Sequence, residues 1–220
     1  RGGGAAGLTC RHDASSRCGG EYVVGRVAAA RTMHPLSDKI TRSLFICQAQ
    51  KRFCLVICNY YFAYGSNMNP ARMRARGLSF IDLWAARLPG YGLRFNKAAH
   101  NQPGVAYANI VPTSNSCVEG VLYALTSGQD IDKMDHFEGT PVRYSRECLQ
   151  VSGDFGHRSA WVYLANPAFV CEGLLPQSRY LEHLLAGEAY LSPSYLDFLR
   201  QQPCQHVESG CPERGLLFND

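Results

Sequence analysis

The stretch that most constrains how this chain folds is the corner at residues 60–67, which reads Tyr-Tyr-Phe-Ala-Tyr-Gly-Ser-Asn. An apolar, aromatic run at residues 53–64 predicts a strand that ends at this corner. A strand that turns sharply into a helix leaves several backbone N–H groups pointing at one place, which favours an anion. We expect Gly65 to adopt a backbone conformation that a side chain would forbid, so that the main chain can approach a ligand. The alternative is an ordinary strand-to-helix connection.

A short helix follows the corner. Asn69 is a good N-cap, Pro70 suits the first helical position, and Gly77 is placed to end the helix. Three arginines lie in this helix, at positions 72, 74 and 76. They resemble a phosphate-binding cluster, but a spacing of two residues scatters them around the helix, so we favour a solvated face.

The rest of the body reads as short strands separated by turn residues. The expected strands are residues 85–95 (broken by Pro89-Gly90), 105–111, 117–125, 144–151 and 160–165, and the expected further helices are 130–138, 177–186 and 193–201. Short strands at close spacing predict a barrel or a strongly curved sheet. We predict one domain at residues 53–203, with a disordered or transit-like extension at 1–52 and a peripheral tail at 204–220.

Composition limits the possible partners. No apolar run approaches the roughly 20 residues that a membrane-spanning helix needs, so no membrane partner is expected. The formal net charge is +4, and residues 1–58 hold nine Lys and Arg against three acids, so the remainder of the chain is net acidic. The positive charge therefore belongs to the extension, and the sequence gives little support for nucleic-acid binding.

Ten cysteines are present, but none forms a CxxC pair and no Cys/His group has zinc spacing. Cys117 and Cys148 fall in strand-like runs, where a thiol behaves as a small buried hydrophobe. We expect reduced thiols, which are typical of a cytoplasmic protein. A Cys/His nucleophile pair is the less favoured alternative.

A second candidate feature is Glu138, at the end of a predicted helix. Ser127 with Asp130 nearly matches a capping box, a buried stripe follows at every third position, and Gly139 ends the helix. An acid at the negative end of the helix dipole is disfavoured, so the pKa of Glu138 should be raised. Such a conflict with local preference is expected at a functional site. The alternative is a solvated last-turn residue.

Together these features resemble the gamma-glutamylcyclotransferase family (AIG2-like). The likeness covers roughly residues 60–200 and rests on the YFAYGSN motif at 61–67, Asn69-Pro70, Leu88-Pro89-Gly90-Tyr91, Val121-Leu122-Tyr123, the segment Asp135-His136-Phe137-Glu138-Gly139 and the aromatic-led strand at Tyr144. It implies an α+β fold, a small mixed β-barrel with a few peripheral helices.

The resemblance also implies an activity, the cyclisation of a γ-glutamyl amino acid or γ-glutamylamine to 5-oxoproline with release of the amine. Glu138 would be the catalytic acid and base, and the γ-glutamyl group would be held by Tyr61, Phe62, Ala63, Tyr64, Gly65, Ser66 and Tyr180. Tyr144 is a further candidate, although a core aromatic is favoured there. No metal or cofactor is implied, the partner is a small γ-glutamyl molecule, and the protein is expected to be a monomer or homodimer. A non-catalytic ligand-binding or interaction domain on the same fold is the alternative.

Overall fold

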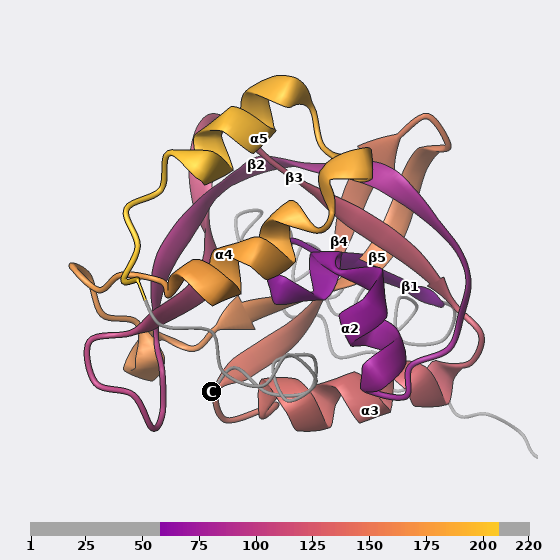
Figure 1. The fold of residues 1–220 in the computed structure, drawn as a ribbon. Coiled ribbons are helices and arrows are strands. Elements are labelled where there is room, and N and C mark those ends of the chain that lie inside the picture. The colour runs from indigo at the N-terminus through magenta and orange to yellow at the C-terminus, as the bar shows by residue number, and fades with distance from the viewer. Residues whose placement is uncertain (1–57, 207–220) are drawn as a thin grey trace, which may run out of the picture. The chain divides into compact units, whose positions relative to one another are not determined.

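The computed structural model describes residues 58–206, which form a closed β-barrel with helices on its outside (Figure 1). The predicted extension at 1–52, residues 53–57 of the first expected strand and most of the tail lie outside the described residues. In the described part no helix is both long and apolar enough to cross a membrane.

The barrel contains five strands in the order β1-β3-β2-β4-β5. Their bounds are β1 Tyr60–Ala63, β2 Phe80–Ala98, β3 Ala106–Leu125, β4 Tyr144–Gly153 and β5 Gly156–Ala165. β1 pairs antiparallel with β3 and parallel with β5, so the barrel is mixed. This confirms the expected fold, and closure removes the unpaired edges that an open sheet would present.

The predicted limits of three strands, at residues 85–95, 105–111 and 117–125, were wrong. β2 and β3 are 19 and 20 residues long and form one antiparallel ribbon, where the sequence suggested shorter, separate runs. Pro89-Gly90 does not end β2, because the register shifts between Pro89 and Tyr91 and Gly90 takes a positive φ of 79°. A bulge of this kind absorbs a proline and bends the strand without ending it.

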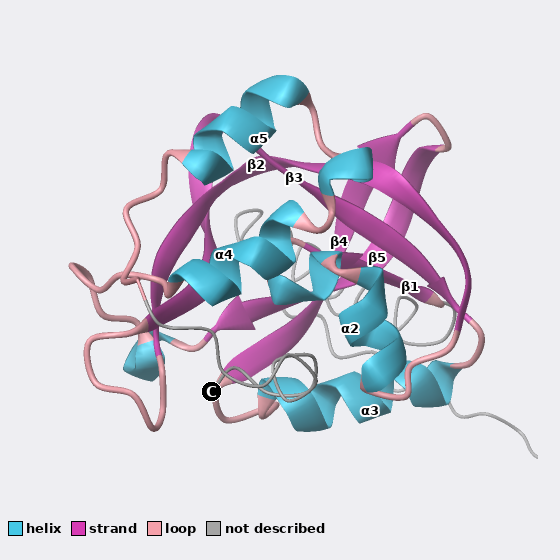
Figure 2. Ribbon diagram, in the orientation of Figure 1, coloured by secondary structure: helices cyan, strands magenta, loops and turns pink. Residues whose placement is uncertain are grey.

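The helices lie outside the strands (Figure 2). They are α2 Pro70–Ala75, α3 Gly128–Glu138, α4 Ser178–Leu185 and α5 Pro193–Arg200, with single 3-10 turns at Ser66–Met68, Pro167–Phe169 and Glu188–Tyr190. The N-terminal caps of α2 and α3 are as predicted: the Asn69 side chain accepts from the N–H of Ala71, and the Asp130 carboxylate accepts from the N–H of Ser127 at 3.1 Å. Helix α4 packs on the Ser66–Met68 turn and on α5.

The barrel interior is apolar and closely packed. Phe62, Val118, Val121 and Leu122 are fully buried, and Trp161 and Val162 of β5 belong to the same core. Strand β1 is central to it, because it lies between β3 and β5 and leads directly into the Gly65 corner. Gln205 of the expected tail pairs with the segment before α4: its N–H donates to Pro176, and its carbonyl accepts from Ser178.

Gly120 of β3 has no room for a side chain. A Cβ there would collide with the carbonyl oxygen of Ala63 and lie 2.9 Å from the Phe62 ring. We therefore expect Gly120→Ala to lower the free energy of unfolding by at least about 1–3 kcal/mol, as overpacking of a core does. Urea denaturation is the measurement. The control is Gly128→Ala at the start of α3, where no atom lies within 4 Å, and the expected change is a gain of about 0.4–1 kcal/mol.

Candidate active site

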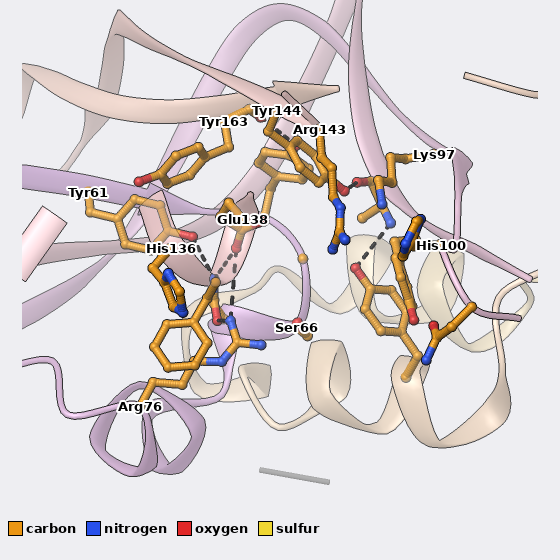
Figure 3. A pocket seen from close by; sticks show the side chains of 18 residues that line it. Tyr61, Ser66, Arg76, Lys97, His100, His136, Glu138, Arg143, Tyr144 and Tyr163 are labelled. Atoms are coloured by element: carbon orange, nitrogen blue, oxygen red, sulfur yellow. Dashed lines mark hydrogen bonds and ion pairs between the residues drawn. The ribbon is translucent and has the colours of Figure 1, made fainter. Parts of the chain in front are cut away.

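A cavity of about 610 Å³ lies where the first strand, the Gly65 corner and the end of α3 meet. It brings the corner residues Tyr61, Tyr64, Gly65 and Ser66 together with Glu138 and Tyr180, which are far from them in the sequence. Residues from the ends of β2, β3, β4 and β5 also line it, namely Lys97, Tyr107, Ala108, Tyr144 and Tyr163. Figure 3 shows Glu138 and Arg76 on one side of this space, Lys97 and His100 on the other, and Arg143 between them.

The Asn67 side-chain amide connects the corner to Glu138. Its nitrogen donates to the Glu138 carboxylate and to the Tyr61 hydroxyl, both at 2.9 Å, and its oxygen accepts from the Arg76 guanidinium at 2.9 Å. The Asn67 backbone carbonyl in turn accepts from the Tyr123 hydroxyl at 2.8 Å. With both ends of the amide engaged and its backbone anchored, Asn67 fixes the position of the carboxylate relative to the corner.

Glu138 is the last residue of α3, and only 17% of its side chain is exposed. Burial raises the pKa of Glu138 above the ordinary value, while the nearby Arg76 cation and the Asn67 hydrogen bond limit the rise. The direction agrees with the sequence prediction, but the cause differs. The prediction relied on the helix dipole, whereas loss of solvent around the carboxylate is the largest effect in the structure.

Two of the three arginines expected on a solvated face are buried, which corrects the sequence interpretation for them, whereas Arg74 is exposed as predicted. Arg72 is fully buried and Arg76 is 9% exposed. Arg76 lies 3.9 Å from the Glu138 carboxylate and stacks over the Phe137 ring at 4.7 Å. Glu138 is therefore not the solvated last-turn residue of the alternative interpretation, because a buried cation lies beside it. Arg76 is the C-cap residue of α2, and helical spacing alone does not show which neighbours cover it.

Tyrosines form much of the remaining wall, and their hydroxyls are held by the backbone. The Tyr180 hydroxyl accepts from the N–H of Ala108 at 3.0 Å, and the Tyr144 hydroxyl donates to the Ala108 carbonyl at 3.0 Å. Burial raises the pKa values of the Tyr144 and Tyr180 phenols well above the usual tyrosine value, so both hydroxyls stay neutral at ordinary pH. These rings give the cavity rigid walls in fixed positions.

A comparison with protein-family models matches residues 61–186 to "Gamma-glutamyl cyclotransferase, AIG2-like". The chain belongs to this gamma-glutamyl cyclotransferase family. The match covers more than half of the chain and includes the corner, Glu138 and Tyr180. A search of the curated proteins found no match.

Solved structures share the fold of this family member. A "Gamma-glutamyl cyclotransferase" is 21% identical with a TM-score of 0.60, and an uncharacterized protein from Homo sapiens is 22% identical with a TM-score of 0.61. Each alignment covers 71% of this chain and 94% of the other. YkqA from Bacillus subtilis is 26% identical with a TM-score of 0.54, over 66% of this chain and 55% of that protein. These similarities establish a shared fold.

The structure separates the predicted substrate-binding residues into two groups. Tyr61, Tyr64, Gly65, Ser66 and Tyr180 line the cavity of this gamma-glutamyl cyclotransferase family member. Phe62 and Ala63 are 0% and 1% exposed, belong to the barrel core, and are not part of the cavity wall. Strand alternation explains Phe62, because its side chain points away from that of Tyr61.

Gly65 has a negative φ of −114° with a ψ of −145°, so it does not lie in the left-handed region. The feature that the structure shows at this position is a lack of space. A Cβ at this position would instead lie 3.0 Å from the Tyr180 hydroxyl. The glycine therefore lets the corner and α4 approach each other beside the cavity.

Several cavity residues carried no sequence signal. Lys97, Tyr107 and Tyr163 are far from both motifs, and closure of the barrel brings them to the site, whereas Arg143 follows the turn after Glu138 and was not singled out. Asn67 was visible as part of the corner, but its contact with Glu138 depends on how α3 packs. Residues 58–206 contain no group of three or more His, Cys, Asp and Glu that could hold a metal ion.

The cysteine expectations held only in part. Cys58, Cys117, Cys171 and Cys204 are free thiols, whereas Cys148 is disulfide-bonded, so the prediction of reduced thiols was wrong at that position. Cys117 is exposed and not the buried hydrophobe that we expected. None of these residues lines the cavity, so a Cys/His nucleophile pair is not found there among the described residues.

If Asn67 holds the site together, removing its amide should destabilise the fold. Asn67→Ala leaves the buried Arg76 and Tyr61 groups without one of their partners, and we expect the free energy of unfolding to fall by about 1–3 kcal/mol. Urea denaturation measures this. Asn59→Ala is the control, because that exposed asparagine lies just before β1. Equal stability of the two variants would contradict the structural role of Asn67.

Proposed function

We propose that this protein is a gamma-glutamylcyclotransferase that converts a γ-glutamyl amino acid or γ-glutamylamine to 5-oxoproline and a free amine, with Glu138 as general acid and base. The observation that carries the proposal is the buried Glu138 carboxylate, held by Asn67 at the wall of the cavity formed by the Gly65 corner. Family membership supports the reaction class, because the corner and Glu138 lie within the matched region.

The chemistry requires a base of the kind that Glu138 provides. The substrate α-amine is an ammonium at neutral pH and cannot attack the γ-carbonyl carbon until it loses a proton. Lactam formation removes two protons from this nitrogen in all, and the departing amine takes up two to leave as an ammonium. A carboxylate with a raised pKa can carry them one at a time, because its affinity for a proton is closer to those of the two amines.

The corner provides the groups that position the substrate. Gly65 and Ser66 line the cavity at the first residues of the 66–68 turn, where backbone N–H groups have no partner within the turn. Such donors suit the substrate α-carboxylate or the oxyanion that forms when the amine attacks the carbonyl. The Ser66 hydroxyl adds a further donor at the same place.

The tyrosine walls would favour the folded conformation of the substrate. The attacking amine and the carbonyl belong to the same molecule, so the enzyme must hold the γ-glutamyl chain bent with these two groups in contact. Good orientation in such intramolecular reactions is worth roughly 10⁵–10⁸ M in effective molarity. Tyr144 and Tyr180, both bound to the backbone of Ala108, are rigid enough to impose this shape.

The direct test replaces the carboxylate. Glu138→Gln keeps the size of the side chain but cannot accept a proton, so we expect 5-oxoproline formation from γ-glutamyl compounds to fall by at least about 10²–10⁴-fold. The measurement is initial-rate chromatographic detection of 5-oxoproline with a panel of γ-glutamyl amino acids and amines. Glu147→Gln, an exposed carboxylate on β4, is the matched control and should keep its activity.

Two outcomes would contradict the proposal. Substantial turnover by a folded Glu138→Gln protein would remove Glu138 from the mechanism. Failure of the wild-type protein to release 5-oxoproline from every compound, with binding retained, would instead favour the alternative of a non-catalytic ligand-binding domain.

A further inference from the structure

A second acid, Asp135, attaches the last turn of α3 to the barrel. Asp135 and Glu138 are three positions apart in this helix, so their side chains leave nearly the same face of it. The Asp135 carbonyl also accepts from the N–H of Thr140 at 3.0 Å, in the turn that ends the helix. Asp135 does not itself line the cavity, but its side chain and its main chain both act within one turn of the proposed catalytic carboxylate.

One oxygen of the Asp135 carboxylate is bound by a tyrosine of the cavity wall. The Tyr163 hydroxyl donates to Oδ1 of Asp135 at 2.6 Å, a length typical of a hydrogen bond to an ionised carboxylate. Burial raises the pKa of the Tyr163 phenol well above the usual tyrosine value, so the hydroxyl remains a donor at ordinary pH. Asp135 is thereby connected to a side chain that faces the substrate space.

Tyr163 in turn contacts the corner that is expected to hold the substrate. Its ring meets the Tyr61 ring edge-on, with the ring centres 5.7 Å apart, and its backbone carbonyl accepts from the Tyr64 hydroxyl. Figure 3 shows Tyr61 and Tyr163 on the same side of the cavity as Glu138. The Asp135–Tyr163 hydrogen bond therefore links the helix that carries the acid to the residues opposite which the acid must act.

The other oxygen of Asp135 is bound by Arg146 of β4. The distance from the Arg146 guanidinium to Oδ2 is 2.9 Å, and both side chains are largely covered, with 21% of Arg146 and 23% of Asp135 exposed. The guanidinium also lies over the Trp161 ring of β5, 4.7 Å from its centre. A planar guanidinium held between a carboxylate and an aromatic ring is well fixed. Through its two oxygens, Asp135 joins α3 to both β4 and β5.

We propose that Asp135 is a positioning residue of the active site, which holds the end of α3, and with it the Glu138 carboxylate, in a fixed place relative to the corner through Tyr163 and Arg146. The catalytic part of this inference rests on the proposed function. A general base must lie within hydrogen-bond reach of the amine that it deprotonates. A displacement of about 1 Å can cost roughly 10²-fold in rate, even where the altered residue lies away from the chemistry.

A purely stabilising role for Asp135 is the alternative interpretation. An ion pair that only strengthens the fold would change the melting temperature and leave the turnover of the folded protein as it was. A positioning role predicts instead a loss in kcat with little change in KM, because the corner and the tyrosine walls that would hold the substrate stay in place. The two roles therefore differ in a quantity that can be measured on folded protein.

Asp135→Asn is the decisive variant, because an amide has one acceptor oxygen and cannot accept from Tyr163 and Arg146 together. We expect kcat for 5-oxoproline formation to fall roughly ten- to a hundred-fold, with a much smaller change in KM. Asp132→Asn is the matched control. It is the same substitution in the same helix, and Asp132 also contacts Arg146, but its side chain is 69% exposed. This control should keep the wild-type kcat.

NMR of the Asn67 side-chain amide provides a readout that needs no turnover. This amide donates to Glu138, so its proton signals report where the carboxylate lies. They should shift in Asp135→Asn and stay in place in Asp132→Asn. If Asp135→Asn does not fold, Tyr163→Phe takes its place in both measurements, because it removes only the hydroxyl that binds Asp135.

The two readouts separate this inference from the proposed function. A kcat equal to that of Asp132→Asn, a loss confined to KM, or unshifted Asn67 signals would each overturn the positioning role and leave the cyclotransferase proposal intact. Absence of turnover in the wild-type protein would overturn the activity. In that case a shift of the Asn67 signals in Asp135→Asn would still support Asp135 as the residue that places Glu138, and unshifted signals would overturn it.

Discussion

The hydrogen bonds of the Asn67 amide are the interaction on which the site depends. Through them a single side chain contacts Tyr61 of β1, Arg76 at the C-cap of α2 and Glu138 at the end of α3. Without this amide the buried Arg76 and Glu138 side chains would face each other at 3.9 Å with no group to set their geometry. The amide fixes the Glu138 carboxylate at the cavity wall. Burial raises the pKa of Glu138, and the hydrogen bond from Asn67 limits that rise.

The barrel supplies the rest of the site by closing. Because β1 pairs with both β3 and β5, the ends of several strands converge beside the corner. That convergence brings Lys97 from β2, Tyr144 from β4 and Tyr163 from β5 to one cavity. The bulges along the β2–β3 ribbon let two very long strands curve enough to close the barrel. The position of the site therefore follows from strand pairing.

The sequence predicted what depends on local rules. The caps at Asn69 and Ser127, the strand alternation and the family motif were enough for the helices and the barrel. The catalytic role of Glu138, which lies in the cavity wall, stays a prediction. It failed where tertiary packing decides which side chains are buried and where a strand ends. Arg72 and Arg76 looked solvated because helical spacing does not show which neighbours cover a helix, and Lys97 fell just beyond the expected strand at residues 85–95. The breaks predicted near Pro89 and within residues 112–116 failed because a long paired ribbon tolerates bulges and turn-forming residues.

The central claim is that Glu138 is a buried carboxylate whose proton affinity is raised by its surroundings and limited by Arg76. Carbon-13 NMR titration of the Glu138 side-chain carboxyl, assigned by its absence in Glu138→Gln, measures this directly. The account predicts a midpoint above the ordinary glutamate value of about 4.3, and a further rise in Arg76→Met, because removing the cation removes an effect that lowers the pKa. A midpoint at or below the ordinary value would contradict it, since Glu138 would then be a solvated or fully neutralised acid.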